Sequence, residues 1–145
     1  MRLTVHTDYA LRLLMYLALK PGKVATIREV AETYGISRNH LVKVAHELGR
    51  AGFVETLRGR GGGLRLARPP EAIGIGDVVR TTEEDFRLVE CFDPQTDHCR
   101  IGPSCRLQHL LHDALDAWLE VLDGATLADL VERPKPLRRL LEITA

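Results

Sequence analysis

The chain has 145 residues, a length that fits one domain or one small domain with an extension. Hydrophobic residues make up 45% of it and charged residues 28%, which permits a packed core and excludes global disorder. No apolar run approaches the roughly 20 residues that cross a bilayer, and the N-terminus lacks the features of a secretion signal. We therefore expect a cytoplasmic protein that has no membrane partner.

Charge is unevenly distributed, although the formal net charge is zero. Residues 1–70 hold 12 Lys and Arg against 5 Asp and Glu, whereas residues 71–145 hold 8 against 15. A basic half joined to an acidic half indicates that the first half meets a polyanion. Charge scattered by chance over a solvated surface is the alternative that these counts leave open.

Three helices are predicted in the basic half by their apolar spacing and by their capping residues. They cover residues 8–19, 27–34 and 38–51. Their expected N-caps are Thr7, Thr26 and Ser37. A tight turn containing glycine joins the second helix to the third, which is the outline of a helix-turn-helix.

A basic hairpin is predicted after the third helix. Residues 53–57 alternate as a strand and residues 64–67 form a returning strand. Between them lies Arg58-Gly59-Arg60-Gly61-Gly62-Gly63, which cannot hold regular structure. This hairpin is the wing of a winged helix-turn-helix, and residues 1–70 are expected to form that DNA-binding domain.

Polar side chains at the start of the third helix and on the wing are the candidates for contacting DNA. A recognition helix meets base edges through its first residues: Arg pairs with guanine and Asn with adenine, while Ser and Lys suit phosphates. Arg on a wing can enter the minor groove. The candidate DNA-binding residues are Ser37, Arg38, Asn39, His40, Lys43, Arg58 and Arg60. Solvation is the alternative for each one alone, but together they predict a protein that binds duplex DNA rather than RNA.

The acidic half is predicted to contain a short helix, an irregular loop and a long helix. The short helix covers 75–80, the loop covers 81–104, and the long helix runs from about Pro103 to Leu122. Residues 71–106 thus comprise the short helix and a loop whose cysteines are expected to bind a metal cluster. Residues 103–145 comprise the long helix, which is expected to mediate dimerisation, and a C-terminal tail. One more short helix is expected from Thr126, and the tail from Pro134 is expected to be peripheral.

Apolar residues of the long helix recur at steps of four and three, as in a coiled-coil seam. The seam residues are Leu107, Leu111, Ala114, Trp118 and Val121. We interpret this seam as a dimerisation surface, and burial within the same chain is the alternative. The fold class expected is mainly α with a small β-hairpin: a winged helix-turn-helix domain plus a long C-terminal dimerisation helix.

Three cysteines, Cys91, Cys99 and Cys105, lie close together in the acidic half. An odd number without a secretion signal disfavours a disulfide framework. Their spacing fits structural zinc poorly, whereas three thiolates on a flexible loop suit an iron–sulfur cluster. Spacing alone does not choose the fourth ligand. The candidates are Asp8, Asp93, Asp97, His98, His109 and His112.

Several segments together resemble the NsrR repressors, the nitric-oxide-sensing branch of a winged-helix iron–sulfur regulator family that also includes IscR. The similarity lies in Leu3-Thr4, in residues 7–12, 37–43, 57–63, 75–80 and 126–131, and in the three cysteines. The resemblance implies a homodimeric repressor that binds a palindromic operator while its cluster is intact and releases DNA when the cluster is nitrosylated.

The resemblance also implies a ligand set. It makes Cys91, Cys99 and Cys105 the thiolate ligands, with Asp8 of the other subunit as the fourth. IscR-like members use a histidine three residues after the last cysteine, where this chain has Gln108. A 4Fe-4S cluster is favoured and a 2Fe-2S cluster is left open.

Three other functions are weighed against this one. The first is an IscR-like regulator that senses cluster supply or redox state. The second is a thiol or iron–sulfur redox protein, which the absence of a Cys-x-x-Cys pair, a nucleotide loop and a base–nucleophile set disfavours, as it disfavours any enzyme. The third is a regulator with zinc or with no metal.

Overall fold

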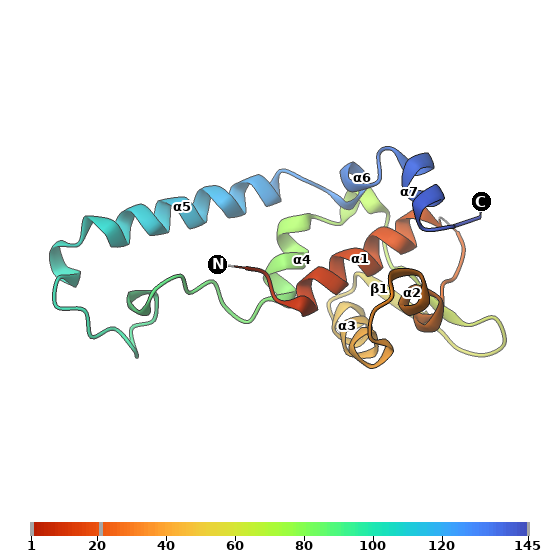
Figure 1. Ribbon diagram of the computed structural model, residues 1–145, viewed down its shortest axis with the longest axis horizontal. Coiled ribbons are helices and arrows are strands. Elements are labelled where there is room, and N and C mark those ends of the chain that lie inside the picture. Colours follow the sequence, from red (N-terminus) through yellow and green to blue (C-terminus); the bar gives the residue numbers. More distant parts are fainter. Residues whose placement is uncertain (1, 21, 145) are drawn as a thin grey trace.

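The computed structural model describes residues 2–20 and 22–144 (Figure 1). The basic half forms a winged helix-turn-helix domain. Its elements are α1 (Val5–Leu19), α2 (Ile27–Tyr34), α3 (Arg38–Arg50), β1 (Val54–Leu57) and β2 (Gly63–Leu66). The predicted fold class, mainly helical with one small hairpin, is confirmed.

The acidic half adds four helices and three single turns of 3-10 helix. The helices are α4 (Ile75–Thr82), α5 (Arg106–Asp123), α6 (Leu127–Leu130) and α7 (Pro134–Leu140). The 3-10 turns are η1 (Pro70–Ala72), η2 (Glu90–Phe92) and η3 (Gly102–Ser104). Among the described residues, no helix is both long and apolar enough to cross a membrane.

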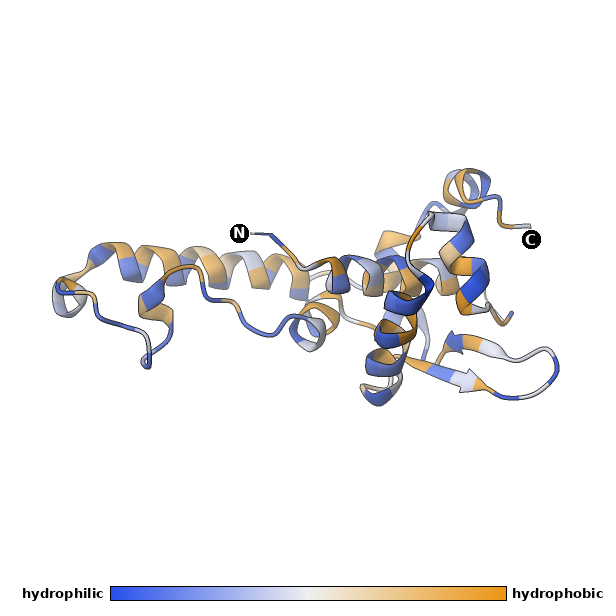
Figure 2. Ribbon diagram, turned by 60° about the horizontal axis from the view of Figure 1, so that its bottom comes forward, coloured by the Kyte–Doolittle hydropathy of each residue, from blue (hydrophilic) through white to orange (hydrophobic). Residues whose placement is uncertain are grey.

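Helix α1 lies at the centre of the winged-helix domain. Helices α3, α4, α6 and α7 pack on it, whereas α2 packs on α3 and α5 packs on α4. Leu13 and Leu14 of α1 are fully buried, as are Leu41 and Leu48 of α3 and Val78 of α4. The buried stripe of α3 therefore faces α1, which fixes the opposite side of α3 toward solvent. Figure 2 shows the hairpin projecting from this body, with α5 extending in the other direction.

The prediction for the start of α1 is wrong by three residues. The helix begins at Val5, and its N-cap is Thr4, whose hydroxyl accepts the Thr7 N–H at 3.2 Å. Thr7, the predicted cap, is instead fully buried within the helix. Its hydroxyl accepts a hydrogen bond from the hydroxyl of Thr82 at 2.9 Å. A threonine whose hydroxyl is hydrogen-bonded to a distant helix cannot be distinguished, from the sequence alone, from a threonine that caps a helix.

The wing is a two-stranded antiparallel hairpin that also pairs with the connection before α2. Val54 lies opposite Leu66, and Leu57 lies opposite Gly63. Ala25 and Leu64 exchange two backbone hydrogen bonds, at 3.0 and 2.8 Å. This close approach requires glycine at position 63, because a Cβ there would lie 2.6 Å from the carbonyl oxygen of Ala25.

Two predictions for the C-terminal part are corrected. The long helix begins at Arg106 rather than near Pro103, because Pro103 belongs to the η3 turn and Cys105 is the N-cap. The tail is not peripheral: it forms α7, and Ile143 is only 9% exposed within the core. Arg138 of α7 donates from Nε to the carbonyl oxygen of Leu19 at 2.8 Å, which satisfies the C-terminal end of α1.

Candidate DNA-binding surface and metal centre

The exposed face of α3 carries the predicted base-reading residues. The Ser37 hydroxyl caps the helix by accepting the His40 N–H at 3.2 Å. Arg38, Asn39 and Lys43 follow it and are all exposed. Because the buried stripe of α3 packs on the core, these side chains point away from the body, as recognition of a major groove requires.

A groove runs between α3, the start of α2 and the base of the wing. One face of α3 contributes Arg38, Val42 and His46, which are four residues apart, and α2 contributes Arg28. Val42 is 48% exposed, although it is apolar. An exposed apolar side chain on this face suits a thymine methyl group. The sequence-based predictions do not include Arg28, Val42 or His46. The four-residue spacing of Val42 and His46 from Arg38 indicates that these two lie on the same helix face as Arg38.

The wing presents its arginines to solvent. Arg58 and Arg60 lie in the turn between β1 and β2 and are exposed. Arg65 on β2 is instead paired with Glu55 on β1 across the hairpin. The two turn arginines are therefore the wing residues whose cationic groups are directed to the surface.

His40 occupies a different position from the other predicted DNA-binding residues. Its ring lies 4.9 Å from the ring of Tyr9, in an edge-on arrangement, and 5.6 Å from the ring of His6. Both partners belong to α1. His40 therefore contacts the helix behind α3, whereas Arg38 and Asn39 face outward.

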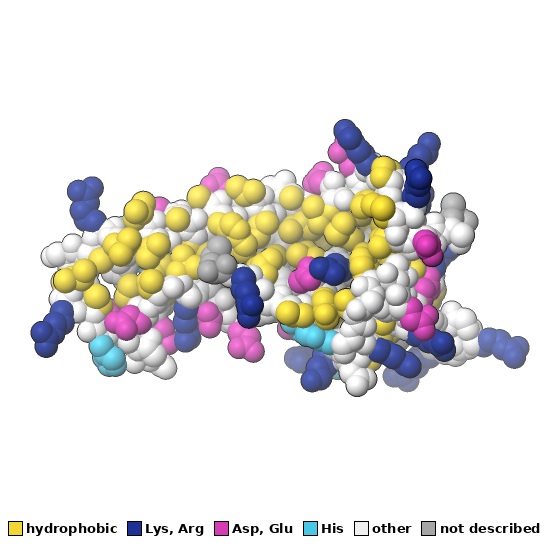
Figure 3. All heavy atoms as spheres, viewed as in Figure 1, with side chains coloured by type: hydrophobic (Ala, Val, Ile, Leu, Met, Phe, Trp, Pro, Cys, Tyr) yellow, Lys and Arg dark blue, Asp and Glu magenta, His cyan; other side chains and the backbone are white. Residues whose placement is uncertain are grey.

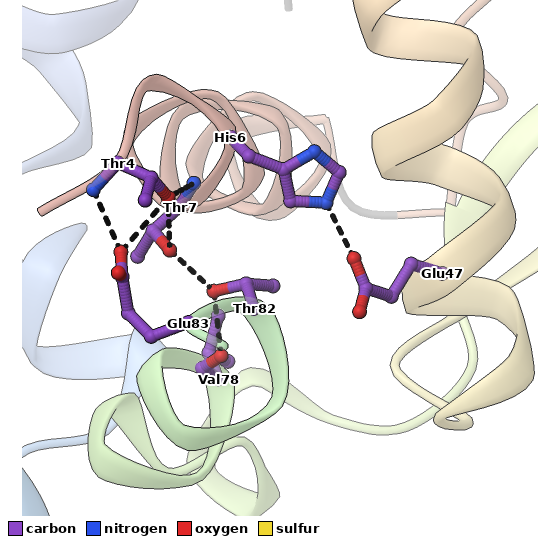
Figure 4. A network of polar contacts seen from close by, with 7 residues as sticks. All are labelled: Thr4, His6, Thr7, Glu47, Val78, Thr82 and Glu83. Carbon is purple, nitrogen blue, oxygen red and sulfur yellow. Dashed lines mark hydrogen bonds and ion pairs between the residues drawn. The ribbon is translucent and has the colours of Figure 1, made fainter. Parts of the chain in front are cut away.

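Polar contacts at the first turn of α1 connect α1 with α3 and α4 (Figure 4). His6 is hydrogen-bonded through Nε2 to the Glu47 carboxylate of α3. On the other side, Glu83 accepts hydrogen bonds from Thr4 N at 2.8 Å and Thr4 Oγ1 at 2.9 Å. Partial burial raises the pKa of Glu83, but hydrogen bonding with the Thr7 hydroxyl and with Thr4 outweighs it, so the net pKa is lowered. Asp8 lies in the same turn, so its backbone is held between both helices.

The three cysteines lie on the segment that connects α4 with α5 and at the start of α5. All three are free thiols and only partly buried. The Cys105 sulfur accepts the Gln108 N–H at 3.4 Å, and the Gln108 side chain donates to the carbonyl oxygen of Cys91, also at 3.4 Å. Gln108 is thus hydrogen-bonded to both Cys91 and Cys105 and links the two residues. Desolvation and the nearby Asp97 carboxylate raise the pKa of the Cys91 thiol.

The chemistry of this donor set fits an iron–sulfur cluster better than a single ion. Among residues 2–20 and 22–144, no three His, Cys, Asp or Glu side chains converge closely enough to hold one metal ion. Thiolates of a cluster bind different irons, so they surround a larger group and do not need to meet at one point. The three partly exposed sulfur donors of this segment are of the ligand type that such a cluster takes.

Within one chain, Asp8 and the cysteine segment are not brought together. Asp8 is in the first turn of α1 and pairs with Arg12, whose Nη2 lies 2.9 Å from Oδ2. The η2 turn that carries Cys91 lies well away from α1 in both ribbon views (Figures 1 and 2). An Asp8 ligand would therefore have to come from a second copy of the chain.

The other candidates for the fourth ligand differ in how they are engaged. Asp93 is 8% exposed and pairs with Arg87 at 2.7 Å. The ring of His112 stacks on Phe92 with centroids 3.9 Å apart. Asp97 accepts the Cys99 N–H at 3.0 Å. The remaining two, His98 and His109, are exposed.

Helix α5 divides its apolar residues between two faces. Leu111, Leu115, Trp118 and Leu122 are partly or fully buried, and Trp118 lies near Phe86 of the same chain. A second face is exposed along the whole helix, which Figure 3 shows as a band of hydrophobic side chains. It consists of Leu107, Leu110, Ala114, Ala117 and Val121. The predicted seam therefore includes residues from both faces, because Leu111 and Trp118 are partly buried within the single chain, whereas the other three seam residues are exposed.

Comparisons with known proteins agree with this architecture. Residues 3–133 match the model of the Rrf2 family, described as iron-dependent transcriptional regulators. The chain is 54% identical to the HTH-type transcriptional regulator NsrR of Bacillus subtilis, over 99% of both chains. It is 53% identical to the NsrR of Shouchella clausii, over 98% of this chain and 96% of that one.

Solved structures are similar as well. A transcriptional regulator from Listeria innocua has a TM-score of 0.75 at 30% identity, over 92% of this chain and 88% of that chain. IscR of T. potens has a TM-score of 0.74 at 26% identity, over 91% and 87%. The chain belongs to the Rrf2 family and is a winged-helix transcriptional repressor of the NsrR and IscR type.

Proposed function

We propose that this chain is a cytoplasmic, nitric-oxide-responsive repressor that binds a palindromic operator as a homodimer while it holds an iron–sulfur cluster. The observation that carries the proposal is the set of three partly exposed thiols, two of them linked through Gln108, beside a complete winged-helix domain. The identity to proteins named NsrR supports nitric oxide as the effector. The role is regulatory rather than enzymatic.

Each DNA-binding residue has a distinct role in this proposal. Arg38 and Asn39 read base edges in the major groove, and Ser37 and Lys43 bind phosphates. Arg58 and Arg60 enter the neighbouring minor groove. His40 was predicted to touch DNA, but its contacts with Tyr9 and His6 favour a supporting role for it.

Cys91, Cys99 and Cys105 would hold the cluster, with Asp8 of a second copy as the fourth ligand. When bound, the cluster supplies iron that can react with nitric oxide. A carboxylate is a harder ligand than a thiolate, so the site held by Asp8 is the weakest of the four. Three thiols and one carboxylate can hold either a 4Fe-4S or a 2Fe-2S cluster. The family resemblance favours 4Fe-4S, and spectroscopy distinguishes the two.

The residues around Asp8 supply the connection to DNA. Two residues before it, His6 bonds Glu47 of α3, and one residue after it, Tyr9 contacts His40 of α3. A change in how Asp8 is held therefore reaches the recognition helix through two contacts. Arg12 is available to pair with Asp8 when Asp8 has no other partner.

The exposed face of α5 supports the homodimer. Leu107, Leu110 and Val121 are 57%, 63% and 74% exposed in the single chain. Together with Ala114 and Ala117, they recur at alternating steps of three and four residues, which is the spacing of a helix–helix seam. Two-fold pairing of two such helices gives two winged-helix domains, as a palindromic site requires.

The test replaces each cysteine by serine in the full chain, prepared without oxygen. We expect Cys91→Ser, Cys99→Ser and Cys105→Ser to lose iron and to bind the operator at least tenfold more weakly, with unchanged circular dichroism. Ser104→Ala, next to Cys105, is the matched control and should keep both properties. Operator binding that survives all three substitutions would contradict the proposal.

A further inference from the structure

The base of α5 is held against α4 by an ion pair that the proposed function does not use. Arg80 of α4 and Asp123, the last residue of α5, are joined by two hydrogen bonds, from Nη1 to Oδ1 and from Nη2 to Oδ2, the second at 2.8 Å. The carboxylate lies directly over Gly76. A Cβ at position 76 would be 1.8 Å from Asp123 Oδ1 and 2.7 Å from Arg80 Nη1. With any other residue at position 76 the Asp123 carboxylate would have to move from its present position.

The chain that follows α5 is fixed at the same place by backbone hydrogen bonds. Ile75 N–H donates to the carbonyl oxygen of Ala125 at 2.9 Å, and Leu127 N–H donates to that of Ile73 at 2.8 Å. Helix α4 in turn packs on α1 through Val78, which is fully buried. We refer to residues 73–80 and 123–127 together as the joint. Because α4 packs on α1, it connects the joint rigidly to the winged-helix domain.

Because α5 is long, a small change of angle at the joint produces a large displacement of the opposite end of the helix. The helix extends away from the winged-helix domain (Figure 1). Its 18 residues span about 27 Å, so a rotation of about 10° at its base displaces the opposite end by about 5 Å. Neighbouring base pairs are about 3.4 Å apart along DNA. In the dimer of the proposed function, where the α5 seam is shared, such a change of angle rotates each winged-helix domain relative to the seam and changes the distance between the two domains.

We propose that Gly76, Arg80 and Asp123 are positioning residues that set the angle between the winged-helix domain and α5, and thereby the half-site separation that the dimer accepts. This inference rests on the dimer of the proposed function. The side chains of Arg80 and Asp123 are 40% and 45% exposed, and exposed pairs add little to stability. A two-pronged pair nevertheless fixes direction, because both bonds must align at once.

Gly76→Ala is the sharpest variant, because its methyl group displaces the Asp123 carboxylate without changing any charge. Position 76 has helical backbone that alanine adopts readily. Asp123→Ala removes the pair from the other side. Asp116→Ala, which removes an exposed carboxylate elsewhere on α5, is the matched control.

The experiment uses the full chain, prepared without oxygen. An operator is selected with the wild-type chain from a random-sequence duplex library, and its spacer is then lengthened or shortened by one and two base pairs. Fluorescence anisotropy measures binding to each duplex and to a single half-site. Wild type and Asp116→Ala should prefer the selected spacing at least tenfold over its neighbours. Gly76→Ala and Asp123→Ala should reduce this preference below threefold or move its optimum, with half-site affinity within twofold of wild type.

Two outcomes would overturn the inference, and they are distinguishable. Should both joint variants keep the wild-type spacing preference, or lose affinity equally at every spacing, the joint has no positioning role while the dimer stands. Should the wild-type chain itself show no spacing preference, the dimer of the proposed function fails, and this inference fails with it.

Discussion

The Nε2 atom of His6 is hydrogen-bonded to the Oε2 atom of Glu47, and this contact joins the first turn of α1 to the recognition helix α3 (Figure 4). Tyr9, one turn further along α1, reaches the same helix through His40. The part of α1 that carries Asp8 therefore makes two side-chain contacts with α3, in addition to the packing of the α3 core residues.

Glu47→Ala is expected to weaken operator binding without changing iron content. A hydrogen bond of this kind contributes about 0.5–1.5 kcal/mol, so the loss of affinity should be about 2- to 12-fold. Anisotropy titrations and iron analysis of the same preparation measure both properties. Glu71→Ala, an exposed carboxylate on η1, is the control. An affinity equal to that of wild type would show that the contact does not position α3.

Arg38→Ala and Lys43→Ala are expected to differ in kind. Loss of a base contact should cost about 1–3 kcal/mol on the preferred operator and relax sequence choice at one position. Loss of a phosphate contact should weaken all duplexes alike and reduce the salt slope by about 1. Binding to operator variants over a range of salt concentrations separates the two effects. Equal behaviour of the two variants would contradict the assigned roles.

Val121→Lys is expected to dissociate the dimer, whereas Glu120→Lys is not. Val121 lies on the exposed apolar face of α5, and Glu120 lies on the polar face one residue before it. Burying a lysine in a helix seam leaves a charge without a partner, which is strongly unfavourable. Sedimentation velocity measures the oligomeric state of each variant. A dimeric Val121→Lys chain would place the interface elsewhere.

Glu29→Gln is expected to destabilise the winged-helix domain at neutral pH and to have less effect in acid. Burial raises the pKa of Glu29, but hydrogen bonds from Lys20 and Tyr16 outweigh it, and the net pKa is lowered. The carboxylate therefore stabilises the fold above its unfolded pKa near 4.5, and this contribution disappears as pH falls through the folded value.

Denaturant unfolding of the metal-free chain between pH 7 and pH 3 measures this effect. Glutamine can still complete the capping box with Thr26, so the loss at pH 7 is that of the charged acceptor for Lys20 and Tyr16, about 1 kcal/mol. Glu32→Gln, which affects only an exposed pair with Arg28, should have a much smaller effect on the free energy of unfolding. A difference between wild type and Glu29→Gln that grows in acid would contradict the assignment.

Local signals in the sequence predict most of the winged-helix domain. The N-caps Thr26 and Ser37, like the helices that they begin, are encoded within one or two turns, and both are confirmed. The errors arise where a residue that is distant in the sequence determines the role or the direction of a side chain. Thr7 resembles a cap because its partner, Thr82, lies 75 residues away. Periodicity alone cannot show that Trp118 faces Phe86 while Val121 faces solvent.

The candidate metal centre is predictable from the sequence only as a set of residue types. Three clustered cysteines indicate soft-metal chemistry, but the role of Gln108 as a bridge between two of them depends on how the loop folds onto α5. The ligand role of Asp8 stays a prediction, because it requires a second chain.

The most direct test of the central claim is operator binding by the full chain, prepared without oxygen, during titration with nitric oxide, with absorbance followed in the same sample. The account predicts a brown dimer that binds tightly and leaves the operator as the visible absorbance changes, with Asp8→Ala losing this response. A colourless preparation that binds with equal affinity before and after nitric oxide would contradict it.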